Sequence, residues 1–519
     1  MQHLKLERNI GALVESAAER YGDKTVLIVD HQGITLSFVQ LNRKVNQFAN
    51  ALAEAGIKTG DHVGVMLPNC VEFPCVWLAL AKLGAVMVPL NVRYQAFDLE
   101  YVLNDSDAVA LIAHTSLAPI YKKIPSEKHN VRKVLLIGEN AGRGEQPLSQ
   151  LAETMADTFQ PAEPELDSLM NIQYTSGTTG FAKGVMTTHE YWLACGATAA
   201  TLGFSGDDML LAMSPFYYMD PQWELIMALS SGGAMVMAEK ISAENFLGCL
   251  KKYPVTITWG SEDLLYLPPF TVEDGVNLKL ILLSAFPPEL HQQFEKHFEV
   301  IAREVYGMTE IGAGSAVPLE DAHMVGSGSI GKPVFNREFR IVNESGKDVA
   351  CGEVGELLVS GPGILKGYYN KPEANEKAFL DGHFRTGDLA RCDDAGYYYF
   401  VGRIKDMIRR MGDNISAEEV EKVLMSHPKI MEAAVIGVPD KTRDEEVKAY
   451  IVPAPGENPE SIPPEEIVAF CLERIAKFKV PRYIEYRTEF PRSTSNKIQK
   501  HKLTKEKEDL TSDCFDRFA

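Results

Sequence analysis

The sequence predicts an α/β protein with two domains: a large N-terminal domain of βαβ-type sheets flanked by helices, and a small α+β domain at the C-terminus. Three observations lead to this prediction. The chain has 519 residues, more than one hydrophobic core usually holds. Its first half alternates helical and strand patterns. From about Asp388 onward, glycines interrupt a charged region that is rich in short strand patterns.

The alternation in the first half begins with a helix. Apolar residues recur at helical spacing from Phe38 to Leu52, and Gly56 stands where a C-terminal cap belongs. Three β-rich runs follow, separated by helix-like segments, at residues 62–67, 85–90 and 108–113. Strands that alternate with helices in this way are typical of βαβ units around a largely parallel sheet.

The last part of the chain has a pattern of its own. Residues 416–419, Ser-Ala-Glu-Glu, form a capping-box sequence that predicts the start of a helix, and His427-Pro428 predicts its end. Strands are predicted at residues 433–438 and 448–453, and a proline-rich loop precedes a further helix. The predicted domains are therefore residues 1–404 and residues 405–519.

The composition is that of an ordinary globular protein, with 45% hydrophobic and 24% charged residues. The formal net charge is −19. This charge argues against a nucleic-acid partner, because phosphate-backbone binding needs a basic surface. It says little against a nucleotide ligand, whose phosphates need only a local nest of N–H groups and one or two cations.

The cysteines and the N-terminus bear on the compartment. Eight cysteines are scattered along the chain, and Cys70 and Cys75 lack the CxxC spacing of zinc and redox motifs. We interpret the cysteines as buried, reduced thiols of a cytoplasmic protein. The N-terminal residues include no apolar signal-peptide core, and the apolar stretch from Cys75 to Leu90 is interrupted by Lys82 and too short to span a bilayer comfortably. No integral membrane segment is expected.

The most informative segment runs from Tyr174 to Gly184, YTSGTTGFAKG, with three glycines, four hydroxyl residues and one lysine. Glycines let several backbone N–H groups converge on one anion, and hydroxyls donate further hydrogen bonds. Lys183 supplies a compact positive charge suited to phosphates. The candidate phosphate-binding residues are Thr175, Ser176, Gly177, Thr178, Thr179 and Lys183. Composition alone leaves a solvated Gly/Ser/Thr loop as the alternative.

Two better-known nucleotide motifs are excluded. The segment is not a Walker A loop, which ends in Gly-Lys-Ser/Thr, because here the residues are Ala182-Lys183-Gly184. Residues 326–331 form a formal GxGxxG, but a dinucleotide fold requires a helix to begin there. Instead Lys332-Pro333 follows, and proline favours extended structure before it.

The string YTSGTTGFAKG resembles the phosphate loop of the adenylate-forming superfamily, which includes acyl-CoA synthetases, peptide-synthetase adenylation domains and luciferases. Four further motifs follow in the family's order across most of the chain. They are YGMTE at residues 306–310, RTGD at residues 385–388, the hinge motif at residues 402–412, and the C-terminal lysine motif PRSTSNKI at residues 491–498. Five motifs in order leave little room for another interpretation.

The resemblance implies ATP-dependent transfer of AMP to a carboxylate, in which two anions meet and charge neutralisation is the main demand. It implies Glu310 as the Mg²⁺ ligand, since a hard cation prefers oxygen ligands. It implies that Asp388 accepts hydrogen bonds from both ribose hydroxyls. The other implied nucleotide-site residues are Thr309 at the phosphate, Tyr306 within its motif, Arg403 at the ribose or phosphate, and Lys497, which bridges the attacking carboxylate and the ribose-phosphate oxygens.

The family completes a second reaction, thioester formation with coenzyme A, after rotating its small domain, so the small domain is expected to be mobile. Lys405 occupies the hinge position, and Gly412 is implied to let the pantetheine chain pass close to backbone. Residues 476–481, AKFKVP, resemble the acyl-CoA synthetase version of their motif. The implied activity is that of an AMP-forming carboxylate–CoA ligase acting on a small-molecule acid. The alternative is a carrier-protein-loading or non-catalytic binding protein that keeps the nucleotide site.

Three positions depart from the family pattern. Tyr217 stands where many acyl-CoA synthetases have His near the carboxylate. Residues 283–288, LSAFPP, replace a Gly/Ala-rich segment beside adenine, and Asn496 replaces a common Gly before the lysine. None of these changes removes a charge that the reaction needs.

The order of motifs places residues 217–223 and 259–263 around the acyl group, with Tyr217 and Trp259 as substrate-binding residues. The two segments also carry Tyr218, Asp220, Trp223, Glu262 and Asp263. Aromatic faces with nearby carboxylates suit a cation, whereas a fatty-acid pocket should be mostly apolar. The chain also resembles carnitine/crotonobetaine–CoA ligases at residues 443–445 and 476–481. We therefore favour a small polar or betaine-type acid. The alternative is that the acids point away and the aromatics pack the core.

Overall fold

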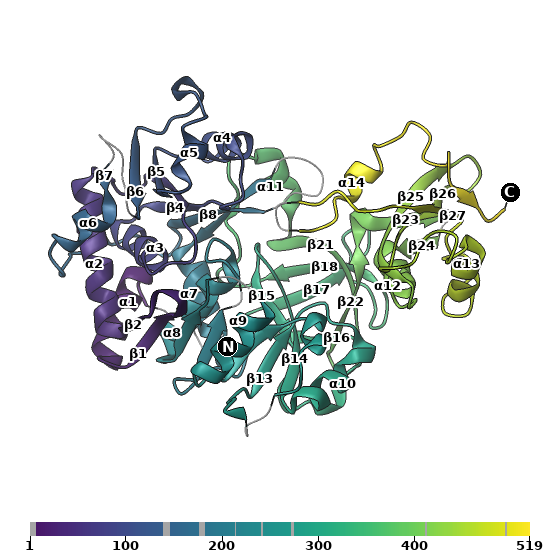
Figure 1. The fold of residues 1–519 in the computed structure, drawn as a ribbon, viewed down its shortest axis with the longest axis horizontal. Helices are drawn as coiled ribbons and strands as arrows, with labels where there is room; N and C mark the ends of the chain where they lie inside the picture. The colour runs from purple at the N-terminus through teal and green to yellow at the C-terminus, as the bar shows by residue number, and fades with distance from the viewer. Residues whose placement is uncertain are drawn as a thin grey trace.

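The computed structural model describes residues 7–138, 146–175, 182–212, 214–239, 242–270, 274–410, 413–493 and 496–518. Five predicted site residues lie outside these ranges: Ser176, Gly177, Thr178, Thr179 and Gly412. The described chain forms three sheets, of which two lie in the large part of the molecule and the third lies in the small part (Figure 1).

The first sheet has eight strands and contains the three strands predicted near residues 62, 85 and 108. Its central pairings are parallel, and only β8–β9 and β9–β19 are antiparallel. The strands, in spatial order, are β19 (Gly367–Tyr368), β9 (Lys183–Thr188), β8 (Leu169–Thr175), β4 (Val86–Pro89), β3 (His62–Met66), β5 (Ala110–His114), β6 (Lys133–Ile137) and β7 (Gln146–Pro147). In the chain, the predicted phosphate loop therefore falls between β8 and β9, which pair with each other.

The second sheet has fourteen strands and is parallel from β1 through β14 and antiparallel beyond. Its order is β17 (Glu338–Val342), β18 (Gly355–Ser360), β21 (His383–Cys392), β22 (Tyr398–Arg403), β16 (Ser329–Pro333), β15 (Gly312–Ala316), β14 (Ile301–Met308), β13 (Leu280–Leu283), β12 (Ile257–Gly260), β10 (Met209–Ala212), β11 (Ala234–Met237), β1 (Thr25–Val29) and β2 (Ile34–Ser37), with β20 (Phe379–Leu380) beside β21. The predicted decoy at residues 326–331 leads into β16, so no dinucleotide-type helix begins there.

Helices cover and join these sheets, and the largest apolar core includes buried residues of both. The predicted helix α2 begins with a capping box at Ser37 and ends before Gly56, whose φ is +88°. The helices of the large part are α1 (Ile10–Tyr21), α2 (Phe38–Glu54), α3 (Glu72–Leu83), α4 (Ala96–Asp105), α5 (Ala118–Tyr121), α6 (Leu148–Glu153), α7 (His189–Ala197), α8 (Met219–Ser231), α9 (Ala243–Lys252), α10 (Pro288–Phe298) and α11 (Pro372–Ala378).

The third sheet is built entirely from the C-terminal part of the chain. Its strands are β24 (Asp413–Ser416), β23 (Met407–Arg410), β26 (Asp444–Pro453), β27 (Tyr483–Tyr486) and β28 (Phe515–Asp516), with β25 (Ile430–Asp440) beside β26. Ser416 caps α12 (Ala417–Met425) as predicted, and α13 (Pro464–Leu472) follows the proline-rich loop. Together with α14 (Lys500–Leu503), these elements form the small α+β domain at the right of Figure 1.

The structure also bears on membrane-spanning helices and on the cysteines. Among the described residues, no helix combines the length and apolarity that a membrane crossing requires. All eight cysteines are described and none is in a disulfide. The expectation that they are buried is wrong for three of them, because Cys351 is exposed and Cys392 and Cys514 are half-buried.

Candidate functional site

A buried carboxylate, Asp388, is contacted by side chains from two other strands of the second sheet. It sits on β21 directly opposite Arg403 on β22, and Arg403 Nε lies 3.0 Å from Asp388 Oδ1. Tyr306, on β14, donates a hydrogen bond of 2.7 Å to the other oxygen, Oδ2. The sheet therefore brings together residues from the YGMTE, RTGD and hinge motifs, which are up to 97 positions apart by their numbers.

Asp388 retains hydrogen-bonding capacity. Its side chain is only 1% exposed, and the contact with Arg403 lacks hydrogen-bond geometry, so Oδ1 has no donor among the described residues. Burial raises the pKa of Asp388, while Arg403 and Tyr306 act in the opposite direction. A buried oxygen without a donor is costly, and a ligand hydroxyl would satisfy it. The geometry fits a ribose.

Glu310 is a second buried carboxylate, near enough for the charge of Asp388 to act on it, and we call the region around these two groups the cleft. Tyr368 donates a hydrogen bond of 3.0 Å to its Oε1, and burial is the main reason that its pKa is raised. Lys183 Nζ lies 4.7 Å from the centroid of the same Tyr368 ring. The neighbouring Thr309 is fixed through its carbonyl, which accepts a hydrogen bond from Tyr191. Lys183, at the start of β9, and Glu310, in the YGMTE segment, therefore both lie beside Tyr368.

Lys497 comes from the small domain to the same cleft. Its side chain keeps access to solvent, yet the protein around it lowers its pKa by desolvation, and the charges of Arg403, Asp220 and Glu310 all act on it. Asn496 before it has a φ of +64°, a region that Asn tolerates better than most residues, which explains how Asn replaces Gly there.

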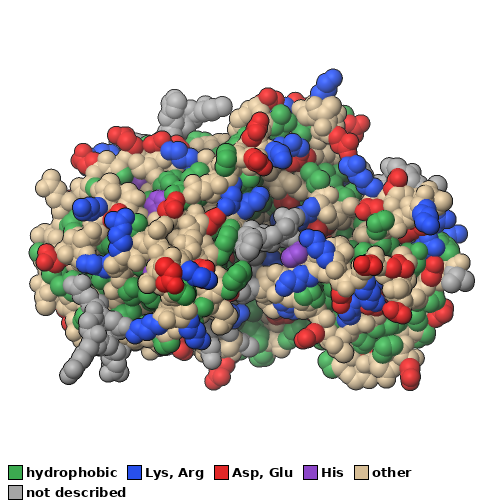
Figure 2. Space-filling model, turned by 90° about the horizontal axis from the view of Figure 1, so that it is seen from above, with side chains coloured by type: hydrophobic (Ala, Val, Ile, Leu, Met, Phe, Trp, Pro, Cys, Tyr) green, Lys and Arg blue, Asp and Glu red, His purple; other side chains and the backbone are tan. Residues whose placement is uncertain are grey.

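Lys and Arg side chains gather along the hollowed middle of the face in Figure 2.

The residues present fit a magnesium ion that is bound together with phosphates. Within the described ranges there is no cluster of three or more His, Cys, Asp or Glu side chains that could hold a metal by themselves. Mg²⁺ usually keeps several waters and uses one or two carboxylates plus substrate phosphates, so a single carboxylate such as Glu310 is sufficient.

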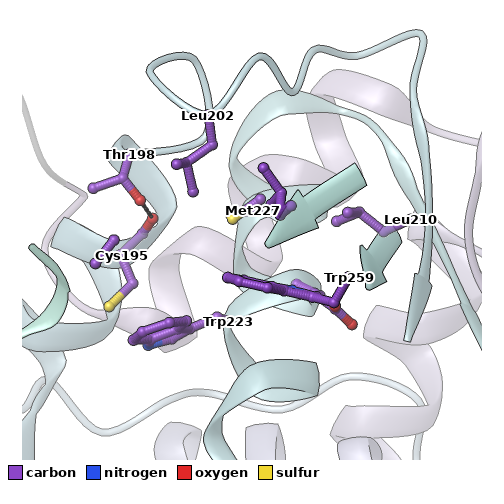
Figure 3. A pocket seen from close by; sticks show the side chains of 10 residues that line it. Cys195, Thr198, Leu202, Leu210, Trp223, Met227 and Trp259 are labelled. Atoms are coloured by element: carbon purple, nitrogen blue, oxygen red, sulfur yellow. Dashed lines mark hydrogen bonds between the residues drawn. The ribbon is translucent and has the colours of Figure 1, made fainter. Parts of the chain in front are cut away.

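A cavity lies between helices α7 and α8 and strands β10, β12, β13 and β15 of the second sheet (Figure 3). The cavity is narrow, with a volume of about 10 Å³. In Figure 3 the indole rings of Trp223, from α8, and Trp259, from β12, both lie at one end of it. The lining residues are Cys195, Thr198, Leu202, Leu210, Trp223, Glu224, Met227, Trp259, Leu282 and Ala313. Glu224 is the one carboxylate among these residues.

Comparisons with known proteins agree over nearly the whole chain. Residues 14–369 match the AMP-binding enzyme family, and residues 419–497 match the AMP-binding enzyme C-terminal domain. The chain belongs to the AMP-binding enzyme family. It is similar to the crotonobetaine/carnitine–CoA ligases of Citrobacter koseri, with 35% identity over 96% of this chain and 99% of the relative, and of Proteus mirabilis, with 36% identity over 94% and 97%.

Solved structures give the same result. ATP-bound MatB from Rhodopseudomonas palustris matches with a TM-score of 0.87 and 26% identity, over 97% of this chain and 100% of that one. The anthranilate–CoA ligase AuaEII in complex with anthranoyl-AMP matches with a TM-score of 0.87 and 28% identity, over 97% and 98%. The predicted mixed α/β fold with a large and a small domain is that of this AMP-binding enzyme family.

One sequence-based expectation about this AMP-binding enzyme is wrong. Glu262 and Asp263 were expected around the acyl group, but both are exposed on the short helical turn η3 (Glu262–Tyr266) and neither lines the cavity. The chain leaves the sheet after β12 and turns outward there, so only Trp259 of that segment points inward. The carboxylate of the cavity is instead Glu224, which sequence reasoning did not single out.

The structure also shows the surroundings of the other two departures from the family pattern, Tyr217 and the segment 283–288. Tyr217 is buried beside Tyr218, with ring centroids 4.7 Å apart, and its carbonyl accepts a hydrogen bond from Gln173; it does not line the cavity. In the segment 283–288, Ala285 has a φ of +54°, and Phe286 N donates to Glu304 Oε1 at 3.3 Å. Burial raises the pKa of Glu304 to about 7.

Proposed function

We propose that this protein activates a small betaine-type carboxylic acid as its acyl-adenylate and then transfers the acyl group to coenzyme A. The observation that carries the proposal is the convergence of Asp388, Glu310 and Lys497 from three separate motifs on one cleft. Two of these groups are buried carboxylates, and the third is a lysine on whose pKa the charge of Glu310 acts. Such an arrangement suits a reaction in which a carboxylate must approach a phosphate.

The first half-reaction assigns a task to each residue. Asp388 accepts the ribose hydroxyls through its free oxygen capacity, with Arg403 and Tyr306 holding the carboxylate in place. Thr309 and Lys183 bind phosphate oxygens. The magnesium ion, when bound, supplies charge neutralisation at the phosphates, and Glu310 is its protein ligand.

Lys497 acts on the reacting groups themselves. Its ammonium neutralises both the attacking carboxylate and the α-phosphate as the new bond forms and pyrophosphate leaves, so no side-chain nucleophile is needed. Its lowered pKa follows mainly from desolvation, which also strengthens each charge–charge interaction that it makes.

The second half-reaction requires the small domain to turn. Lys405 lies on the short turn η6 (Ile404–Asp406), between the last strand of the second sheet and the first strand of the third. We place the domain boundary between residues 404 and 405 and the hinge at Lys405. In the turned conformation, Gly412 is the position at which the pantetheine chain passes.

The betaine-type acid is supported by similarity and by the cavity. The relatives in Citrobacter koseri and Proteus mirabilis are named crotonobetaine/carnitine–CoA ligases. Most side chains that line the cavity are apolar, but it also carries a carboxylate beside two indole rings, a combination that suits a cation better than a hydrocarbon tail at that point.

The proposal is tested by two assays with purified protein. ATP–pyrophosphate exchange without CoA detects adenylation, and we expect exchange with crotonobetaine or carnitine that exceeds exchange with medium- and long-chain fatty acids. Thioester formation with free CoA then separates a ligase from a carrier-protein loader. Exchange without thioester formation would identify a loader, and no exchange with any carboxylate would identify a non-catalytic binding protein.

A further inference from the structure

Glu224 is a buried carboxylate that lacks the partners such a group normally has. It lies on α8 with only 2% of its surface exposed, and neither of its oxygens has a hydrogen-bond donor among the described residues. Burial raises its pKa well above the ordinary value, and the neighbouring carboxylate Asp220 acts in the same direction. Trp259 lies near enough to oppose this shift without making a hydrogen bond of good geometry.

The surroundings of Glu224 are aromatic and apolar. Trp223 precedes it on α8, Trp259 approaches from β12, and Met227 lies on the next part of the same helix; all three line the cavity (Figure 3). Gly312 packs against this end, since an added Cβ would lie 3.5 Å from a Trp223 ring atom and 3.1 Å from the Cys195 sulfur. Indole faces attract cations through their quadrupole, most strongly when water is excluded.

Buried carboxylates are retained when they have a partner, because an unpaired one is costly. Among the described residues, neither Glu224 oxygen has a hydrogen-bond partner and no cationic side chain contributes to its pKa shift. We propose that Glu224, between Trp223 and Trp259, binds the quaternary ammonium group of the substrate acid and thereby determines specificity. This inference rests on the proposed function, and it assigns the recognition of the substrate's charge to one residue of this chain.

The position of Glu224 along α8 also limits the length of the acid. Asp220 lies four residues earlier, and its pKa responds to Lys497, so this end of the helix is near the reacting groups. Four residues of helix rise about 6 Å. Four bonds between a carboxyl carbon and a quaternary nitrogen span about 5 Å, given C–C bonds of about 1.5 Å. A short acid with a terminal trimethylammonium group therefore reaches Glu224 while its carboxylate remains near Lys497.

A quaternary ammonium group fits the part of the cavity near Glu224 better than a primary ammonium group does. A primary ammonium has three N–H donors and needs several acceptors, whereas only Glu224 offers a carboxylate here and the other lining side chains are largely apolar or aromatic. A trimethylammonium group has no donor to satisfy. It contacts ring faces and the Met227 side chain through its methyl groups and uses Glu224 only as a counter-charge.

The test compares crotonobetaine with its carbon isostere, 5,5-dimethylhex-2-enoate, in which a quaternary carbon replaces the charged nitrogen. Wild-type protein is expected to prefer crotonobetaine in kcat/KM for adenylation. In Glu224→Gln this preference should fall about 10- to 100-fold, the range typical of hydrogen-bonded or paired charges. The ratio of the two acids is the decisive readout, since a purely structural role of Glu224 would lower both activities together.

Glu262→Gln is the matched control, because it removes the same charge close to Trp259 in sequence but at an exposed site outside the cavity. It should leave the preference unchanged. If Glu224→Gln keeps the wild-type preference, the assignment of Glu224 is overturned while the proposed function stands. If wild-type protein prefers the isostere, the betaine-type substrate itself is wrong. Glu224→Asp, which retains the charge, should keep more of the preference than Glu224→Gln and covers the case in which Gln does not fold.

Discussion

The proposed nucleotide cleft and the proposed acyl cavity surround their buried carboxylates in opposite ways. In the cleft, Asp388 has Tyr306 and Arg403, and Glu310 has Tyr368. In the cavity, Glu224 has no hydrogen-bond donor within the described chain. All three have pKa values raised mainly by burial. The difference therefore lies in what the protein itself provides to offset that burial.

This contrast corresponds to what we propose that each region binds. A cleft that binds the same nucleotide in every turnover gains from carboxylates that are already held in place, since preorganised groups need no rearrangement during the reaction. A cavity that selects one acid gains from a charge left unsatisfied, because a neutral competitor then leaves a buried carboxylate without a partner. Selectivity in the cavity is thus obtained at the expense of stability.

The strongest test of the cleft is Lys497→Ala. Adenylation should fall by at least about 100- to 1,000-fold, since one preorganised charge at a reacting group commonly contributes that much. Thioester formation from supplied acyl-AMP should be largely spared, because Lys497 serves only the half-reaction in which its domain faces the nucleotide. Pyrophosphate exchange and a CoA assay with isolated acyl-AMP measure the two steps separately.

Lys502→Ala is a suitable control for Lys497→Ala. It removes a lysine from the same domain, on α14, without touching the cleft motifs. It should leave both steps near the wild-type rate. Equal losses of the two half-reactions in Lys497→Ala would contradict the role proposed for this lysine.

A smaller effect is expected for Asp388→Asn. The amide keeps the shape of the side chain but loses the charge, so it binds hydroxyls and Arg403 more weakly. Hydrogen bonds to charged groups contribute about 1.5–3 kcal/mol, which corresponds to roughly a 10- to 100-fold rise in the KM for ATP. Titration of ATP at saturating acid measures it. A change confined to the KM for the acid would place Asp388 away from the nucleotide.

The sequence predicted the cleft better than the cavity for a physical reason. Cleft residues occur in short segments that resemble the motifs of the adenylate-forming superfamily, so the resemblance named each of them without knowledge of the fold. The cavity is made by α7, α8, β10, β12, β13 and β15, and which side chains point inward depends on packing between them. Glu262 and Asp263 are near Trp259 in sequence but turn outward.

A signal for Glu224 was nevertheless present. It precedes fourteen uncharged residues, 225–238, in a segment that is largely apolar. A single carboxylate at the start of such a run predicts a buried charge, and helical spacing places Asp220, Glu224 and Met227 on one face. Sequence reasoning predicted no helix over residues 219–231, so it did not place these three residues on one face. The domain boundary and the role of Lys405 remain predictions.

Lys405→Pro tests whether the two regions act in sequence through one hinge. Proline fixes φ and restricts the preceding residue, so it should slow the rotation that follows adenylation. Thioester formation from isolated acyl-AMP should fall about tenfold, equivalent to about 1.4 kcal/mol, and adenylation should change less. Lys405→Ala, which removes the side chain but leaves the backbone free, is the control. A wild-type rate of thioester formation in Lys405→Pro would place the hinge elsewhere.

The smallest effect concerns the stability of the cavity without substrate. Because burial raises the pKa of Glu224, the folded state holds a proton that the unfolded chain releases above about pH 4.3. The stability of the wild-type protein therefore decreases as pH rises from there toward the folded-state pKa, whereas Gln does not titrate. Glu224→Gln should melt one to a few °C higher than the wild-type protein at pH 8, with a smaller difference at pH 5.

Saturating crotonobetaine should reverse this order of melting temperatures at pH 8, because it stabilises only the protein that binds it well. Thermal melts at both pH values, with and without this acid, measure the effect. A wild-type protein that is more stable than Glu224→Gln at pH 8 in the absence of substrate would mean that Glu224 already has a partner within the protein, and the contrast between cleft and cavity would not hold.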